Sequence, residues 1–195
     1  MERVANWDNI EPMNMGERET LEAQGYVCKI LKAEERLSTT NKKMLVLYFD
    51  IIEGKHAGYY NRLFEAQKKS NKDPNTEIKW KGIYRQMLEG DNFENYLKGL
   101  TDHLEKDNPG YKFDFDQDKM KGLIFGGLFG KEEYIGQFDG KVHTATRIRY
   151  IIDVERVRNL DYDIPPLREV EKKENPFSSN ENPFGNQVAD DDLPF

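Results

Sequence analysis

The strongest constraint on the fold is a strict alternation of side chains along residues 43–53. Successive side chains of a β-strand point to opposite faces, so this alternation predicts a strand with one face in the core. The predicted core set is Leu45, Leu47, Phe49 and Ile51, and the opposite set is Met44, Val46, Tyr48 and Asp50. We therefore expect a β-sheet with a buried face at this point of the chain.

Four other segments have the β-branched and aromatic composition that is typical of strands, namely residues 25–33, 59–64, 121–134 and 142–153. Residues 53–58 contain two glycines, and we expect them to close a hairpin between the second and third strands. This hairpin would place Tyr60 and Arg62 on the same face of the third strand. Three glycines, at positions 126, 127 and 130, predict bulges or a sharp bend in the fourth strand.

Helical spacing follows the third predicted strand, after a loop over residues 66–77. The apolar residues of 80–88 recur at i, i+3, i+4, i+7 and i+8, which predicts a first helix. Asp91 and Glu94 form a capping pattern for a second helix, which ends at Asn108-Pro109-Gly110. The predicted fold class is mainly β: an OB-fold, a five-stranded partly open barrel with a two-helix connector between strands 3 and 4.

The composition changes after Pro165-Pro166, where apolar periodicity stops. Residues 174–177 read Glu-Asn-Pro-Phe and recur as residues 181–184, among Ser, Asn and Gly. Such a segment is typical of a flexible, disordered linker, and the repeat is either a local duplication or a second docking motif. We therefore predict three parts: an N-terminal lead-in over 1–24, an OB-fold domain over 25–168, and a flexible tail over 169–195.

The tail ends in three acidic residues followed by two apolar side chains around a proline: Asp190, Asp191, Asp192, Leu193, Pro194 and Phe195. The three carboxylates resist burial in the protein's own fold, whereas the apolar side chains and the terminal carboxylate suit a basic-rimmed hydrophobic pocket on a partner. This tip resembles the acidic C-terminal tip of bacterial single-stranded-DNA-binding proteins, which recruits replication and repair enzymes. The competing interpretation is a frayed acidic end, because charged termini are common.

Positive charge is clustered although the whole chain has a net charge of -7. Residues 62–85 hold seven bases and three acids, and residues 141–158 hold five bases and two acids. Clustering of this kind is the electrostatic footprint that binding to a polyanion requires. The overall acidity therefore does not exclude nucleic acid as a partner.

Single-stranded DNA needs cations for its phosphates and flat rings for its unstacked bases. We predict that Tyr48, Tyr60 and Arg62 lie on the second and third strands, where OB-folds bind nucleic acid, with Lys42, Lys43 and Lys141 in the flanking loops. Arg147 and Arg149 would share a strand face, and Lys68, Lys69 and Lys72 would extend the basic track. In the competing interpretation Tyr60 packs inside the barrel and the lysines form a solvated rim; Trp80 is expected to pack in the core.

Several short runs of the body resemble a family of phage and prophage proteins from Gram-positive hosts. They are Gly25-Tyr-Val-Cys-Lys-Ile30, Leu47-Tyr-Phe-Asp-Ile51, Lys79-Trp-Lys-Gly-Ile-Tyr-Arg85, Asn108-Pro-Gly-Tyr111 and Gly126-Gly-Leu-Phe-Gly130. Proteins of that family are regarded as single-stranded-DNA-binding proteins of phage replication modules. The resemblance implies a role in phage DNA replication, recombination or repair, and it transfers no individual contact residue.

The sequence gives no support to an enzyme. Cys28 is the only cysteine, so a disulfide within the chain and a cysteine-rich zinc site are excluded, and a reducing cytoplasm, that of a bacterial host, fits. The three histidines are scattered, and no phosphate-binding loop is present, so we expect no metal and no cofactor. The resulting hypothesis is a non-enzymatic protein that binds single-stranded DNA without strong sequence preference and recruits replication, recombination or repair proteins. A strand-annealing factor and a protein-only replication adaptor remain alternatives, and self-association stays open.

Overall fold

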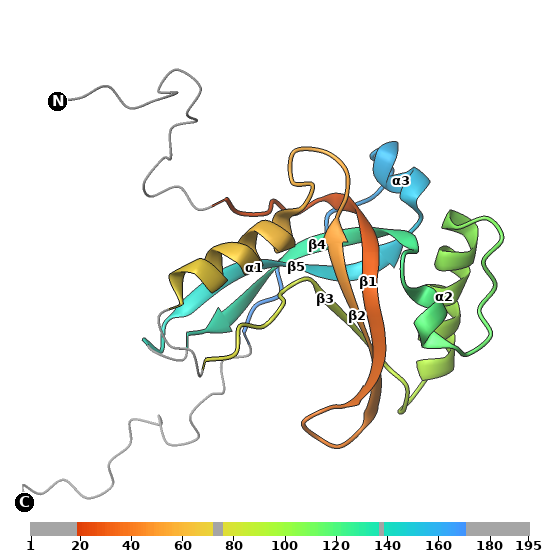
Figure 1. The fold of residues 1–195 in the computed structure, drawn as a ribbon. Helices are drawn as coiled ribbons and strands as arrows, with labels where there is room; N and C mark the ends of the chain where they lie inside the picture. The colour runs from red at the N-terminus through yellow and green to blue at the C-terminus, as the bar shows by residue number, and fades with distance from the viewer. Residues whose placement is uncertain (1–18, 72–75, 137–138, 171–195) are drawn as a thin grey trace, which may run out of the picture.

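The computed structural model describes residues 19–71, 76–136 and 139–170. The strands are β1 (Gly25–Leu37), β2 (Lys43–Ile51), β3 (Ile83–Met87), β4 (Ile124–Ile135) and β5 (Val142–Ile152). The helices are α1 (Tyr59–Ser70), α2 (Phe93–Asp107) and α3 (Val154–Arg158), with a 3-10 turn, η2, at Gln117–Met120. In the described ranges no helix has the length and apolar character needed to cross a membrane. Figure 1 shows α1 and α2 on opposite sides of the β1–β2 ribbon.

The five strands form one antiparallel sheet in the order β3-β2-β1-β4-β5. Strand β1 lies between β4 and β2 and pairs with both. Residues 25–29 pair with β4, and residues 28–37 pair with β2 in a long hairpin. Strands β3 and β5 are the two edges of the sheet, and they do not pair with each other within the described residues. The fold class is therefore mainly β, as predicted, and the antiparallel sheet is not closed.

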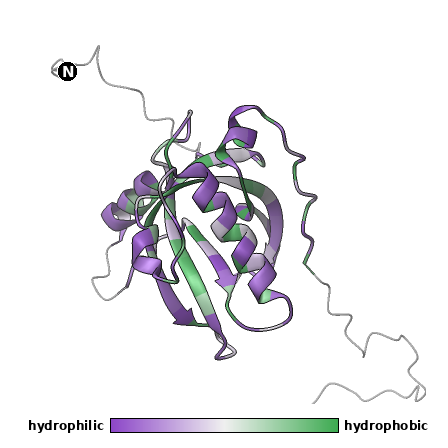
Figure 2. Cartoon of the chain, turned by 90° about the vertical axis from the view of Figure 1, so that its right-hand side faces the viewer, coloured by the Kyte–Doolittle hydropathy of each residue, from purple (hydrophilic) through white to green (hydrophobic). Residues whose placement is uncertain are grey.

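The predicted core face of β2 is confirmed, since Leu45, Leu47, Phe49 and Ile51 are all buried. The Phe49 ring makes edge-to-face contacts with Tyr60, Phe125 and Phe129 at centroid distances of 5.4, 5.5 and 6.1 Å. Such contacts add to the stabilisation that comes from apolar burial. Figure 2 shows hydrophobic residues along a central strand and hydrophilic ones over the outer surfaces of the helices.

Helix α3 packs on a second, smaller apolar cluster, formed by Val27, Leu128, Ile152, Val154 and Val157. Asp153 joins this helix to α2, because its carboxylate accepts a hydrogen bond from His103 Nδ1 at 2.6 Å and forms an ion pair with Lys106. Burial alone would raise the pKa of Asp153, but the hydrogen bonds from Lys106 and His103 outweigh it and hold that pKa below its usual value.

Helix α2 and the strands β4 and β5 lie where the sequence predicts them, and α2 begins after Asn92. A register shift lies beside the glycine-rich part of β4, between Leu128 and Phe129, but the extra residue is Arg149, so this bulge is in β5 and not in β4 as predicted. The expected first strand is longer than predicted, because β1 continues to Leu37 alongside β2.

Two predictions about the middle of the chain are wrong. Residues 59–64 do not form a strand but begin α1, which also takes up the first part of the predicted loop 66–77. The carboxylate of Asp50 accepts the backbone N–H groups of Tyr60 at 2.9 Å and Asn61 at 3.1 Å. An acceptor at these otherwise unsatisfied donors stabilises a helix N-terminus, so a residue of β2 decides the conformation here.

The second wrong prediction is the helix over residues 80–88, where the structure has β3. Strand β2 supplies a ladder of backbone partners, from Met44 opposite Met87 to Tyr48 opposite Ile83. The predicted connector of two α-helices between strands 3 and 4 is therefore also wrong, because α1 precedes β3, and α2 and the 3-10 turn η2 lie between β3 and β4. The predicted lead-in and tail lie mostly outside the described residues, as does the whole of 171–195.

Candidate nucleic-acid interface

A cleft of about 700 Å³ lies between the two edge strands of the sheet. One wall comes from β3 and the residues before it, the other from β5, and α1, Leu21, Glu132 of β4 and Arg168 complete the lining. The lining residues are Leu21, Tyr59, Tyr60, Leu63, Lys79, Trp80, Lys81, Ile83, Tyr84, Arg85, Glu132, Ala145, Thr146, Arg147, Ile148, Arg149 and Arg168. The cleft therefore occupies the gap that pairing between β3 and β5 would close.

The side chains that line this cleft carry mostly positive charge. Six bases line it, Lys79, Lys81, Arg85, Arg147, Arg149 and Arg168, against the single carboxylate of Glu132. None of the six forms an ion pair with any residue that the structure describes, whereas cations elsewhere do, such as Arg158 with Glu53 and Lys98 with Asp102. Like charges gathered in a cleft produce a local positive potential, which favours an anionic ligand.

Aromatic side chains supply part of the same surface. Trp80 is half-buried and donates its indole N–H to the Phe49 carbonyl oxygen at 3.0 Å. Its ring lies beside the Phe64 ring, with a centroid distance of 5.6 Å. Tyr84, on β3, is also half-buried and lines the cleft. These contacts fix the ring of Trp80 while leaving part of it accessible, which is the condition for stacking of an unpaired base.

The end of the cleft beside α1 is fixed by residues 19–21. Glu19 accepts hydrogen bonds from Arg62 Nη2 at 2.8 and 2.9 Å, and it pairs with His56 Nδ1 at 2.8 Å. Burial tends to raise the pKa of Glu19, but the hydrogen bonds from Arg62 and His56 outweigh it and lower that pKa. On the other wall, the Thr146 hydroxyl donates to the Leu21 carbonyl oxygen at 2.7 Å. Residues 19–21 therefore join α1 to β5 across one end of the cleft.

Neither the known protein families nor the curated proteins include a match to this sequence. The interface is therefore assigned from its own chemistry. Where the structure describes the chain, no group of three or more His, Cys, Asp and Glu side chains is placed to hold a metal ion.

The structure brings three of the predicted contact residues together in the cleft: Tyr60, Arg147 and Arg149. Arg147 is exposed, and its guanidinium lies 5.7 Å from the centroid of the Tyr134 ring. Tyr60 is only 7% exposed and packs on Phe49, and burial raises the pKa of its hydroxyl. The competing interpretation of Tyr60, a residue of the core, is thus supported.

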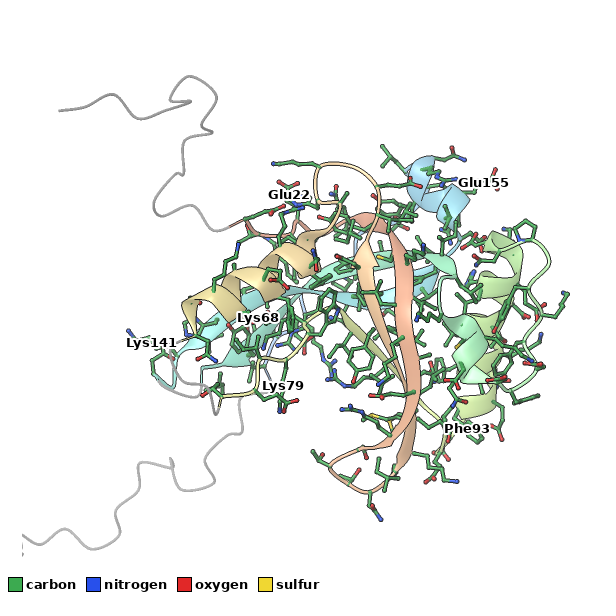
Figure 3. The ribbon with its side chains drawn as sticks, in the orientation of Figure 1. Glu22, Lys68, Lys79, Phe93, Lys141 and Glu155 are labelled. Carbon is green, nitrogen blue, oxygen red and sulfur yellow. The ribbon has the colours of Figure 1, made fainter. Side chains whose placement is uncertain are left out.

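Other predicted residues lie around the cleft. Arg62 is on α1, not on a strand, and its guanidinium is held by Glu19. Lys68 and Lys69 are in the last turn of α1, and Lys141 follows the turn between β4 and β5. Figure 3 shows Lys68, Lys79 and Lys141 toward one end of the molecule, with Phe93 and Glu155 toward the other. These lysines can extend the positive surface beyond the cleft.

Tyr48 and the β1–β2 hairpin form a separate surface. The Tyr48 hydroxyl donates to Glu34 at 2.7 Å, and Lys32 and Arg36 lie over its ring at 5.7 and 5.8 Å from the centroid. Lys42 and Lys43 are exposed near the turn of the same hairpin. Lys72 and the tip residues Asp190, Asp191, Asp192, Leu193, Pro194 and Phe195 lie outside the described residues, so their predicted roles remain predictions.

Sequence reasoning missed most of the wall formed by β3. Lys79, Lys81, Tyr84, Arg85 and Arg168 line the cleft but were not predicted contacts. The signal was present, since bases and aromatic residues are interleaved along 79–85. Helical spacing obscured it, because a helix would have turned these side chains to different sides.

Proposed function

We propose that this protein binds single-stranded DNA, without catalysing a reaction, in the cleft between β3 and β5. The observation that carries the proposal is the set of six bases that have no ion-pair partner among the described residues and are interleaved with aromatic side chains along one cleft. The cations can contact successive phosphates while Trp80 and Tyr84 offer flat surfaces to unstacked bases. Recognition of backbone and ring faces is tolerant of sequence, because every nucleotide has both.

The open five-stranded antiparallel sheet supports this proposal, and we interpret it as an OB-type barrel that is open at one seam. The sheet order puts β3 and β5 at the two edges, and α2 lies between the third and fourth strands. Nucleic acid binds OB-folds on the face of strands 2 and 3 and on the loops beside it. Tyr48, Arg85 and the β1–β2 hairpin belong to that region, so a strand leaving the cleft across β3 would meet them.

The biological setting follows from the resemblances of the sequence. The short runs that resemble phage and prophage proteins support a role in phage DNA replication, recombination or repair, in the cytoplasm of a bacterial host. In this proposal the body protects exposed strands, and the acidic tip recruits a replication or repair protein. The mechanism is passive binding, so no metal or cofactor takes part.

A charge-matched comparison tests the proposal. One variant changes Lys79, Lys81 and Arg85 to Gln, and the control changes Lys29, Lys55 and Lys121, which are exposed, form no ion pair within the described ranges, and lie outside the cleft. Fluorescence anisotropy would measure the affinity of each full-length protein for labelled oligothymidine and for a matched duplex, at several salt concentrations.

We expect preferential, salt-sensitive binding of the single strand by the wild type. Only the cleft variant should lose affinity strongly, and the slope of log affinity against log salt should fall by about 2, since each lost phosphate contact removes about 0.7. Equal losses in both variants would mean that binding follows net charge and not the cleft. Absence of any salt-sensitive binding would refute the proposal and favour a protein-only adaptor.

A further inference from the structure

Arg149 occupies an unusual position at the wall of the cleft, because it lies at a bulge in β5. Tyr150 lies opposite Leu128 and Ile148 lies opposite Phe129, so Arg149 has no opposing residue on β4. A bulge of this kind interrupts the regular alternation of a strand and redirects one side chain. The neighbouring Gly130 provides room, since a Cβ atom there would lie 3.2 Å from Cγ of Arg149.

Arg149 is half-buried, and one nitrogen of its guanidinium is buried without a partner among the described residues. Its Nη1 atom is inaccessible to solvent and has no hydrogen-bond acceptor among the described residues, and no described carboxylate forms an ion pair with it. The guanidinium is positively charged and donates hydrogen bonds only. Removing a charged donor from water without an acceptor costs free energy, and a turn of the side chain that brings Nη1 to an anion in the cleft would recover it.

The adjacent Arg147 differs in each of these respects. It lies on the same strand and lines the same cleft, but it is exposed and its guanidinium contacts the ring of Tyr134. Water already satisfies its donors, so a phosphate near Arg147 gains only a screened attraction. The two arginines therefore provide an internal comparison between a desolvated contact and a solvated one.

We propose that Arg149 is the phosphate anchor of the cleft, the residue that takes one phosphodiester group out of solvent and fixes the register of the bound strand. This inference rests on the proposed function and names the group of the ligand that the site recognises. The planar guanidinium can donate two parallel hydrogen bonds to a phosphate, which an ammonium group does not reproduce. The exposed bases of the cleft then add attraction that depends on salt but not on geometry.

The test compares Arg149→Lys and Arg149→Gln with Arg147→Lys and Arg147→Gln in the full-length protein, at low and at high salt. We expect Arg149→Lys to weaken oligothymidine binding about tenfold at both salt concentrations, because a buried, geometric contact is poorly screened. Arg147→Lys should stay within about twofold of the wild type, and Arg147→Gln should be defective only at low salt. Thermal unfolding of each variant checks that the fold is retained.

A second readout separates the anchor from the proposed function. In protein with ¹⁵N-labelled arginine, inorganic phosphate should shift one side-chain Nε–Hε signal before the others, and that signal should be missing from Arg149→Lys. Equal behaviour of the two Lys variants, with DNA binding intact, would overturn the anchor and leave the cleft proposal standing. If no variant binds oligothymidine, the phosphate titration alone decides, and an unshifted Arg149 signal overturns the anchor as well.

Discussion

Gly82 lies between the cleft residues Lys81 and Ile83 and packs tightly against β2, and replacing it by alanine should open that contact. A Cβ atom at this position would lie 2.2 Å from the Phe49 carbonyl oxygen, 2.8 Å from Cδ2 of Tyr60 and 2.9 Å from Nε1 of Trp80. Because the nearest of these atoms belongs to the backbone of β2, a change of side-chain rotamer does not relieve the clash. Gly82→Ala must therefore move the start of β3 away from β2.

The structure sets the size of the effect. Ordinary contact begins near 3.4 Å, so the two backbones must separate by about 1.2 Å. That movement breaks the hydrogen bond from Phe49 N to Gly82 O, at 2.9 Å, and the one from Trp80 to Phe49 O, at 3.0 Å. Overpacking costs about 1–3 kcal/mol and each lost hydrogen bond about 1 kcal/mol, so we expect a destabilisation of about 3–5 kcal/mol.

Urea unfolding measures this difference, with Trp80 emission and far-ultraviolet circular dichroism as two probes. Gly99→Ala is the matched control, since Gly99 is inside α2 and has nothing within 4 Å of an added Cβ. That control should stabilise the protein by about 0.5–1 kcal/mol through helix propensity. A loss below about 1 kcal/mol for Gly82→Ala would show that β2 and β3 do not approach so closely, and the geometry assigned to the cleft wall would be wrong.

Three further outcomes are expected. Asp153→Asn should lower the free energy of unfolding at neutral pH by about 1–3 kcal/mol. Because the pKa of Asp153 is held low in the folded state, the wild type keeps the stabilisation from this carboxylate above the unfolded-state pKa and loses it as pH falls through the folded-state pKa. Urea unfolding at a series of pH values would measure this loss. Deleting residues 190–195 should tighten oligothymidine binding at low salt if the acidic tip competes for the cleft; unchanged or weaker binding counts against that competition. The chain has two tryptophans, so Trp7→Phe leaves Trp80 as the only one. In this variant oligothymidine should quench Trp80 emission, and an unchanged spectrum would mean that bases do not reach the wall of the cleft that contains Trp80.

The parts of the fold that the sequence predicts correctly are those in which one periodicity has no competitor. Residues 43–51 alternate with period two over a full strand, and their predicted core set is buried. In α2, apolar residues recur at helical spacing, and Leu100 and Leu104 are buried; the predicted cap at Asp91 is wrong, because the N-cap is Asn92 and it makes no side-chain capping hydrogen bond. In such segments the local pattern and the tertiary contacts favour the same structure, so local reasoning is sufficient.

The two wrong segments depend on residues that are distant in sequence. Residues 59–64 carry tyrosines and a phenylalanine that suit a strand, but the Asp50 carboxylate holds the backbone N–H groups at the start of α1. The side-chain pattern of residues 83–87 is compatible with a helix or with a strand. These residues form a strand because the backbone groups at the edge of β2 pair with them. Neither contact is visible in a local window, which is why intrinsic propensity is overridden here.

Charge clustering predicted the walls of the basic cleft better than the secondary-structure prediction did, and the sheet order explains why. The basic stretch 62–85 ends inside β3, and the stretch 141–158 contains β5; these two strands are the opposite edges of one sheet. Curvature brings these edges to the two sides of a single cleft, whatever the conformation of the segments between them. Pairing β3 with β5 would bring the six bases of the cleft closer together with only the carboxylate of Glu132 to compensate them, and like charges at short range oppose that pairing. The open seam is therefore consistent with the excess of cations that have no ion-pair partner among the described residues, and under the proposed function an anion bound between the two edges would offset their mutual repulsion.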